Sequence, residues 1–274
     1  MVTKGAVASK KDTRIMFIKA RTLDGFQLQG QDGRLGTVDD FYYDDQQWTI
    51  RYLIANTGSW LADRQVLISP YALRDVNLID KLVNVDLPKD QIENSPLLET
   101  GLPVSAQFEE DYYKYYLWPS YWGGPFLWGA YPGIPRDPVR WQLPTSQEKA
   151  WGSHVRSIRD LRGNEFHATD GDIGHVSDAI IDDTSWEIRY FIIDTHNWWP
   201  GKKVLIDPKW IESVSWGEEK VSVNLTREAI RQSPEYTPEA LLRRDYEVEL
   251  YRHYQRPGYW ETTPPAQTPV GSAR

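Results

Sequence analysis

The sequence predicts a mainly β fold, built from two tandem copies of a small barrel of about six strands with a helix after each barrel. Two segments of the chain carry this prediction: DDQQWTIRYLIANT at 44–57 and DDTSWEIRYFIIDT at 182–195. Trp48 and Trp186 define an offset of 138 residues, and the same offset aligns the chain before and after the two segments without a gap. A repeat of this length indicates that one structural unit is duplicated in the chain.

The repeat also divides the chain into domains. With 274 residues, 40% of them hydrophobic, the chain is long enough for two units with a core each. Residues 18–122 are the first barrel unit with its trailing helix, 123–150 a connector rich in Pro, Gly and Trp, and 151–260 the second unit with its helix. Residues 1–17 and 261–274 are predicted to be a flexible N-terminus and a disordered tail, because neither carries a pattern of apolar side chains to bury.

Each strand is read from alternation and turn residues. Gly33 and Gly36 are expected to break the chain before TVDDFYYD, whose β-branched and aromatic side chains suit a strand. A D-D-x-x hairpin turn, the run TIRYLIA or EIRYFII, a VLI strand and a closing V-x-V-x-L follow in both copies. The far end of EIRYFII is apolar on both faces, which indicates a strand deep inside a closed sheet. Six short strands at this spacing favour a small barrel over a βαβ layout.

Longer helices are predicted at the ends of the units. In TPEALLRRDYEVELYRHY, Thr237 is the expected N-cap and Pro238 the first helical residue. An apolar stripe at four-residue spacing supports this helix, and the counterpart SAQFEEDYYKYYLW at 105–118 keeps the stripe. The stripe of the second helix is Leu242, Tyr246, Leu250 and Tyr254.

Composition excludes several classes of protein. Zero cysteines rule out disulfides, thiol nucleophiles and iron–sulfur clusters. No apolar run approaches the length of a membrane span and the N-terminus lacks the apolar core of a secretory signal, so we expect a cytoplasmic protein without a membrane span. The net charge of -8 disfavours nucleic acid as a partner. No glycine pattern for nucleotides and no G-x-S-x-G motif is present, and we predict no cofactor.

The combined pattern resembles a known family. A glycine-bounded strand, a D-D-x-x-W hairpin, R-Y-L/F-I, V-L-I-x-P and a closing V-x-V-x-L before a helical turn ending in S-P resemble the PRC-barrel, in two copies at roughly 18–98 and 156–236. The cytoplasmic part of the photosynthetic reaction centre H subunit and the C-terminal part of the ribosome-maturation factor RimM share this domain. The resemblance implies the fold and a protein-contact module, and it assigns no functional residue.

Acidic residues recur at matched positions of the two copies. Paired carboxylates can serve as general acid and base in a shared cleft, but Asp also favours turns because its side chain binds nearby backbone N–H groups. We expect turn chemistry here, and the spacing of a calcium loop is missing. The matched acids are Asp40, Asp44 and Asp45 in the first copy and Asp178, Asp182 and Asp183 in the second.

Two further matched pairs have structural interpretations. Arg51 and Arg189 are expected to pair with a cross-strand carboxylate, such as Asp39 or one near Glu187. The matched tryptophans of the hairpin are expected to fill the core, because burying one large aromatic side chain stabilises a fold by several kcal/mol.

The second copy carries candidate metal ligands that the first copy lacks. His167, Asp170, Asp172 and His175 fall within nine positions around a predicted turn and offer nitrogen and oxygen ligands. Zinc requires such ligands to converge at ~2.0–2.2 Å, and nothing in this spacing enforces convergence. Solvated histidines are therefore favoured over a metal site.

We expect a non-catalytic scaffold or adaptor of bacterial type, comparable with the H subunit, whose barrels present protein-binding surfaces. Aromatic side chains at turns and unit ends are the candidates for protein contact. They are Trp60, Trp198, Trp199, Tyr121, Trp122, Tyr259 and Trp260. One alternative is a metal- or ligand-binding protein or enzyme that uses the His/Asp cluster, and another is a ribosome-associated factor similar to RimM, which the acidic charge disfavours.

The two units are expected to pack as an intramolecular pseudo-dimer. A contact between identical subunits uses the same patch on both partners, so a duplicated unit inherits a self-complementary surface. We expect the connector and the two trailing helices to cover this junction. The sequence does not identify the protein partner, and it leaves further oligomerisation open.

Overall fold

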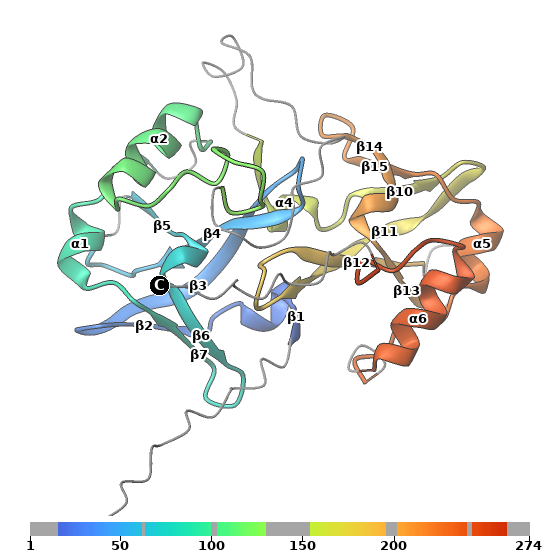
Figure 1. Cartoon of the computed structure of the whole chain (residues 1–274), viewed down its shortest axis with the longest axis horizontal. Coiled ribbons are helices and arrows are strands. Elements are labelled where there is room, and N and C mark those ends of the chain that lie inside the picture. The colour runs from blue at the N-terminus through green and yellow to red at the C-terminus, as the bar shows by residue number, and fades with distance from the viewer. Residues whose placement is uncertain are drawn as a thin grey trace, which may run out of the picture.

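The structure is a computed structural model, and it describes residues 16–61, 64–99, 103–129, 154–195, 202–239 and 243–261. These residues form two β units that lie side by side (Figure 1). Each unit is a curled sheet built on six main strands, and each is followed by a longer helix. The prediction of a mainly β fold with two tandem small barrels is confirmed.

The first unit is an almost entirely antiparallel sheet. Its strands are β2 (Gln27–Gly30), β3 (Gly33–Asp44), β4 (Thr49–Asn56), β5 (Arg64–Ile68), β6 (Leu73–Asn77), β7 (Leu82–Val85) and β8 (Leu98–Glu99). They are hydrogen-bonded in the order β6-β7-β2-β3-β4-β5-β8. β2 pairs with β7 in parallel, which brings the end of the unit back onto its beginning and curls the sheet.

The second unit repeats this topology. Its strands are β10 (Glu165–Ala168), β11 (Gly171–Asp182), β12 (Ile188–Asp194), β13 (Lys203–Ile206), β14 (Ile211–Ser215) and β15 (Lys220–Val223), in the order β13-β12-β11-β10-β15-β14. The parallel pair β10 and β15 faces Glu165 with Lys220, and the same offset of 138 takes this pair to Gln27 and Leu82. The two copies therefore share their strand register as well as their amino-acid sequence.

The glycines at the start of β3 lie within the strand and do not break it, contrary to the expectation from the sequence. β3 runs continuously through Gly33 and Gly36, and β11 through their counterparts. At Gly36 the backbone has a φ of +146°, and a Cβ would collide with the carbonyl oxygen of Asn56 on β4. Glycine is required because β4 approaches β3 too closely for a side chain.

The central strands are buried on both faces, as the apolar runs predicted. Seven of the eight residues of β4 are buried, and five of the seven residues of β12. Tyr52 of β4 meets Tyr112, and Tyr190 of β12 meets Tyr251, both in the helix that follows the unit, while Phe191 of β12 meets Trp48 of the opposite unit.

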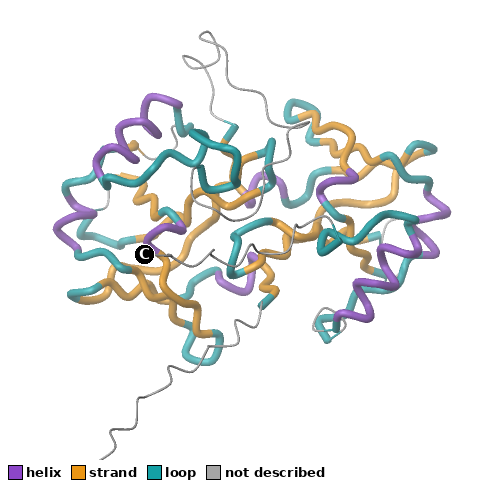
Figure 2. Tube along the Cα trace, in the orientation of Figure 1, coloured by secondary structure: helices purple, strands orange, loops and turns teal. Residues whose placement is uncertain are grey.

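The longer helices lie at opposite ends of the molecule (Figure 2). α1 (Lys89–Glu93) and α2 (Ala106–Tyr115) follow the first barrel, and α5 (Arg227–Gln232) and α6 (Arg244–His253) follow the second. The hydroxyl of Tyr112 on α2 donates to the carbonyl of Leu67, and Tyr251 on α6 donates to the carboxylate of Asp207. Each helix therefore packs on its own barrel, and the expectation that these helices cover the junction is wrong.

The predicted start of the second helix is also wrong. α6 begins at Arg244, so Thr237 is not its N-cap. The hydroxyl oxygen of Ser105 caps α2 by accepting the Phe108 N–H at 3.1 Å, and the position matched to Ser105 is Arg243, whose side chain makes no such bond. The two helices keep the register of the repeat although the second has lost its cap.

Candidate functional site

The junction of the two units is made of strands that each unit gives to the other. β1 (Phe17–Lys19) precedes the first barrel but pairs with β11 of the second, whereas β9 (Val155–Ser157) pairs with β3 of the first. Phe17 faces Asp182, and the offset takes this pair to Val155 and Asp44, which also face each other. Figure 1 shows β1 in the centre, between the two units. The exchange is reciprocal and has two-fold pseudo-symmetry.

The pseudo-two-fold axis passes between the hairpins that carry the repeated segments. Thr49 and Glu187, which are related by the offset, form an antiparallel bridge. The N–H of Ile50 donates to the carbonyl of Trp186 at 2.8 Å, and the N–H of Ile188 donates to the carbonyl of Trp48 at 2.7 Å. Each hydrogen bond is the image of the other, so the segments that the chain repeats are the segments through which its halves meet.

The two hairpin tryptophans contact the opposite unit. The ring of Trp48 stacks on Tyr43 at a centroid distance of 5.6 Å and meets Phe191 of the second unit edge-on at 5.2 Å. Trp186 lies 6.5 Å from Phe41 of the first unit. Both tryptophans are buried, which confirms them as core residues, and both have a positive φ, 51° and 60°. Such a backbone conformation is rare for a bulky residue, and the shared core holds it in place.

One pair of matched acids binds the turns that follow the exchanged strands. Asp40 accepts the Ser157 hydroxyl at 2.5 Å and the Arg159 N–H at 3.3 Å, both from the second unit. Asp178 accepts the N–H of Arg21, from the first unit, at 3.4 Å. These turns are η1 (Ala20–Leu23) and α4 (Ile158–Leu161). Burial raises the pKa of both carboxyls, and the hydrogen bonds only partly offset it.

Another pair of matched acids fixes the residue before each exchanged strand. Asp183 accepts the N–H of Met16 at 2.8 Å, and the N–H of Asp183 donates to the carbonyl of Met16. At the matched position, Asp45 forms ion pairs with His154 at 3.3 Å and Arg156 at 3.2 Å. The hydrogen bond to Asp45 raises the pKa of His154. These two acids therefore hold segments of the opposite unit.

The remaining pair, Asp44 and Asp182, closes the hairpin turns. One oxygen of each accepts the two N–H groups that follow in the turn, which confirms turn chemistry for this pair. The other oxygen lies 3.0 Å from the guanidinium of Arg51 or Arg189. Arg189 also pairs with Glu187 at 2.6 Å. Both arginines thus have carboxylate partners, but Asp39, the suggested partner, pairs instead with Arg159 at 3.1 Å.

A buried carboxylate in each trailing helix was not singled out from the sequence. Glu109 of α2 accepts the hydroxyls of Tyr52 at 2.9 Å and Tyr121 at 2.8 Å. Burial raises the pKa of Glu109 to about 7, although the two tyrosine hydrogen bonds act to lower it. At the matched positions, Glu247 accepts the hydroxyls of Tyr190 at 2.7 Å and Tyr259 at 3.2 Å. Each of these residues in the first copy matches its counterpart in the second copy at the offset of 138. The repeat in the sequence could therefore have indicated this site.

The start of the connector crosses from the first unit to the second. The fully buried guanidinium of Arg51 lies 3.9 Å from the ring centroid of Tyr121 and 4.9 Å from that of Trp128, and it donates to the carbonyl of Leu127 at 2.8 Å. The indole N–H of Trp128 donates to the carbonyl of Ser185 at 3.0 Å. Within residues 123–129 the connector therefore touches the junction; predicted connector residues 130–150 lie outside the described part of the chain.

Three of the aromatic contact candidates make specific contacts within their own unit, although only Tyr121 is buried and Trp60 and Tyr259 are half-buried. Tyr121 and Tyr259 bind the buried glutamates, and the ring of each lies against the hairpin arginine of its unit, Arg51 or Arg189. The indole N–H of Trp60 donates to the carbonyl of Leu35 at 3.0 Å, with the ammonium of Lys89 over its ring. These side chains stabilise their own barrels.

Of the remaining contact candidates, two pack edge-on against a tyrosine of the trailing helix and two lie outside the described residues. Trp122 meets Tyr113 edge-on at 5.3 Å, and Trp260 meets Tyr251 edge-on at 5.1 Å. Both rings keep part of their surface accessible. Trp198 and Trp199 lie outside the described part of the chain, as do the first 15 residues and the tail from 262 onward.

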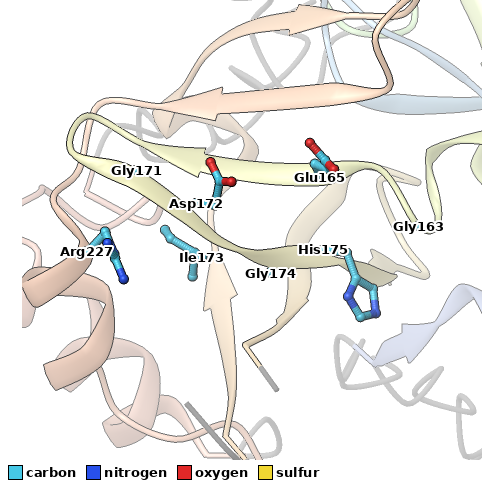
Figure 3. A pocket seen from close by; sticks show the side chains of 8 residues that line it. All are labelled: Gly163, Glu165, Gly171, Asp172, Ile173, Gly174, His175 and Arg227. Carbon is cyan, nitrogen blue, oxygen red and sulfur yellow. The ribbon is translucent and has the colours of Figure 1, made fainter. Parts of the chain in front are cut away.

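The candidate metal ligands do not converge. His167 pairs with Asp172 at 2.7 Å and with Glu165 at 3.3 Å, while Asp170 accepts the first N–H of α5 at 2.7 Å. His175 lines an open groove of about 700 Å³, in which Glu165 and Asp172 point to one side of the hairpin and His175 to the other (Figure 3). Across the described ranges, no group of three or more His, Asp or Glu side chains is placed to hold a metal ion.

Two sheets of one topology, locked together by exchanged strands, define a tandem small-barrel protein. The family model of the PRC-barrel domain matches residues 16–92 and 154–230, once on each unit, and the chain belongs to this family. A comparison with curated proteins found no match. Of the helices in the described ranges, none is long and apolar enough to cross a membrane.

Proposed function

We propose that this PRC-barrel protein is a non-catalytic scaffold of the bacterial cytoplasm, which binds protein partners on the surfaces of two barrels fixed to each other. The observation that carries the proposal is the reciprocal junction. Residues that the two copies share, such as Trp48 with Trp186 and Asp40 with Asp178, hold one unit to the other. Their retention has a structural explanation that requires no substrate.

The buried charges support a non-catalytic role in the same way. Asp44 uses one oxygen for its turn and the other for Arg51, and Glu109 binds two tyrosine hydroxyls. General acid–base chemistry would need carboxyls that reach a substrate in a cleft. These carboxyls are instead buried against their partners, at exposures of 4% for Asp44 and 5% for Glu109.

Membership in the PRC-barrel family supports protein binding as the activity. The domain acts as a contact module in the H subunit of the photosynthetic reaction centre, to which this chain is similar in its barrel. Two barrels held at a fixed angle can present two surfaces to one partner at once, and that arrangement raises the effective concentration of the second contact.

Crosslinking of the full-length tagged chain in its source cells, followed by mass spectrometry and reconstitution with the purified candidates, tests the proposal. We expect at least one protein to form a stable complex, with crosslinks at lysines outside the junction, such as Lys114 and Lys209. The proposal fails if every crosslinked protein sediments separately from the chain after mixing.

A further inference from the structure

A groove of about 530 Å³ opens at the junction, on one side of the pseudo-two-fold axis. Both units line it: Tyr42 comes from β3, whereas Asp160 and Asn164 follow β9 and Trp216 and Glu219 lie on the β14–β15 hairpin. Grooves of this volume at the boundary between two domains are a common form of binding site.

The opposite side of the axis has a different chemistry at the same positions. The offset takes the acid Glu219 to a base, Lys81, and the acid Asp160 to a neutral residue, Thr22. Several residues that hold the units together, such as Trp48 with Trp186 and Asp40 with Asp178, are identical in both copies, whereas the acidic residues of this groove have no acidic counterpart at the matched positions. Such divergence indicates that the two sides serve different contacts.

Asn164 is a buried polar side chain that lacks a partner. The residue is 3% exposed and lines the groove, and its carboxamide makes no hydrogen bond to any residue that the structure describes. Its amide atoms keep contact with the solvent and are therefore open to the groove, whereas the matched position carries the apolar Phe26. The retained amide points to a hydrogen-bonding group that enters from the groove.

The groove also carries uncompensated negative charge beside aromatic rings. Asp160 and Glu219 are exposed and form no ion pair with a described residue. The guanidinium of Arg156 lies 5.3 Å from the ring centroid of Trp216 and is paired with Asp45. The Trp216 ring is therefore already engaged by a guanidinium of this chain, although part of its surface stays accessible, while the carboxylates of Asp160 and Glu219 remain available for another cation.

We propose that this groove binds an arginine side chain within an extended segment of the protein partner. A planar guanidinium can lie against Tyr42 and the accessible part of Trp216, pair with Asp160 and Glu219, and donate an N–H to the amide oxygen of Asn164. This inference rests on the proposed scaffold function and specifies the chemistry of the partner.

The test titrates the full-length chain with an N-acetylated, C-amidated Gly-Gly-Arg-Gly-Gly peptide, followed by the indole N–H signals in two-dimensional NMR. The signal of Trp216 is assigned through its loss in Trp216→Phe. We expect saturable shifts of that signal with a Kd of about 0.1–1 mM, typical of so few contacts. Asp160→Asn, Glu219→Gln and Asn164→Leu should each weaken binding at least tenfold, as should citrulline in place of arginine.

Glu218→Gln is the matched control, because it removes an equal charge from the same hairpin at a residue that does not line the groove. It should change the Kd less than twofold. An equal loss in this variant, no saturable shift, or free arginine methyl ester binding as tightly as the peptide would overturn the inference. So would self-association of the chain that the groove variants abolish, since the occupant would then be a second copy.

The partner found by crosslinking separates this inference from the scaffold function. A partner that binds the groove variants as tightly as the unchanged chain refutes the groove and leaves the scaffold intact. Loss of partner binding in Asp160→Asn and Asn164→Leu, but not in Glu218→Gln, supports both.

Discussion

Thr49 and Glu187 are the same position of the repeat, and they face each other across an antiparallel bridge. In a dimer of identical barrels, this position would meet itself, and a Glu would face a Glu with like-charge repulsion. The duplicated chain avoids this because the two copies differ there. Glu187 pairs with Arg189 at 2.6 Å, while the matched Arg51 instead donates to the carbonyl of Leu127. Joining two units in one chain thus permits an asymmetric junction.

The strand exchange predicts a disulfide between the two units. Lys19 of β1 faces Ile180 of β11, and the hydrogen bond between Asp183 and Met16 places Lys19 and Ile180 at a non-hydrogen-bonded pair of the ladder. Cα atoms of such pairs lie about 4.5 Å apart, within the range that a disulfide spans. Lys19→Cys with Ile180→Cys, in a chain without cysteine, should oxidise to a monomeric product with altered mobility on a non-reducing gel.

Lys19→Cys with Ile181→Cys is the control, because a shift of one residue places the second side chain on the other face of the sheet. This pair should stay reduced under the same conditions. Disulfide-linked dimers from the first pair, in place of the monomeric product, would show that β1 reaches a different chain.

The buried ion pair of Arg51 and Asp44 predicts a large loss of stability when one partner is removed. Arg51→Met should lower the free energy of unfolding by about 3–5 kcal/mol, because the Asp44 carboxylate stays buried without its cation. Urea denaturation measures this. Arg74→Ala removes an exposed pair with Asp75, at side-chain exposures of 67% and 52%, and should change stability by less than about 1 kcal/mol. Similar losses in both variants would contradict a buried pair.

The strands could be predicted from the sequence because alternation and turn residues are local properties. The sheet that a short strand joins is not local. Phe17–Lys19 and Val155–Ser157 are three residues each, too short to show alternation, and both pair with the opposite unit. Turn chemistry identified Asp44 from its neighbours, but the role of Asp40 depends on Ser157, 117 positions away.

Glu109 shows the same limit for the candidate site. Its helix reads FEEDYY, in which adjacent acids look like a solvated face. Glu109 is buried because Tyr52 of β4 and Tyr121 reach it from distant parts of the chain, while Glu110 beside it is exposed. The matched Glu247 was the available signal, since a solvated acid has little reason to keep its place in both copies.

The close approach of β3 and β4 predicts that Gly36 tolerates no side chain. Gly36→Ala should destabilise the protein by more than about 2 kcal/mol, because the new Cβ would collide with the carbonyl oxygen of Asn56 and φ is +146°. Thermal unfolding followed by circular dichroism measures the loss. Gly217→Ala is the control: nothing lies within 4 Å of its Cβ position, and stability should change by about 0.5 kcal/mol or less. Equal effects would refute a steric role for Gly36.

The buried carboxyl of Glu109 predicts a pH-dependent stability. Its pKa rises from 4.5 to about 7 on folding, so the folded state holds the proton more tightly than the unfolded state. The resulting stabilisation is fully present below pH 4.5 and is lost as the pH rises to about 7, a change of about 3 kcal/mol. Glu109→Gln keeps an oxygen that can accept from both tyrosines and should lose this decline, whereas the exposed neighbour changed as Glu110→Gln should retain it. Urea denaturation between pH 4.5 and 8 measures how the free energy of unfolding changes with pH in the unchanged chain and in the two variants. A decline that Glu109→Gln fails to reduce would assign the pH dependence to other groups. Glu247 is the first of these to change, because burial also raises its pKa.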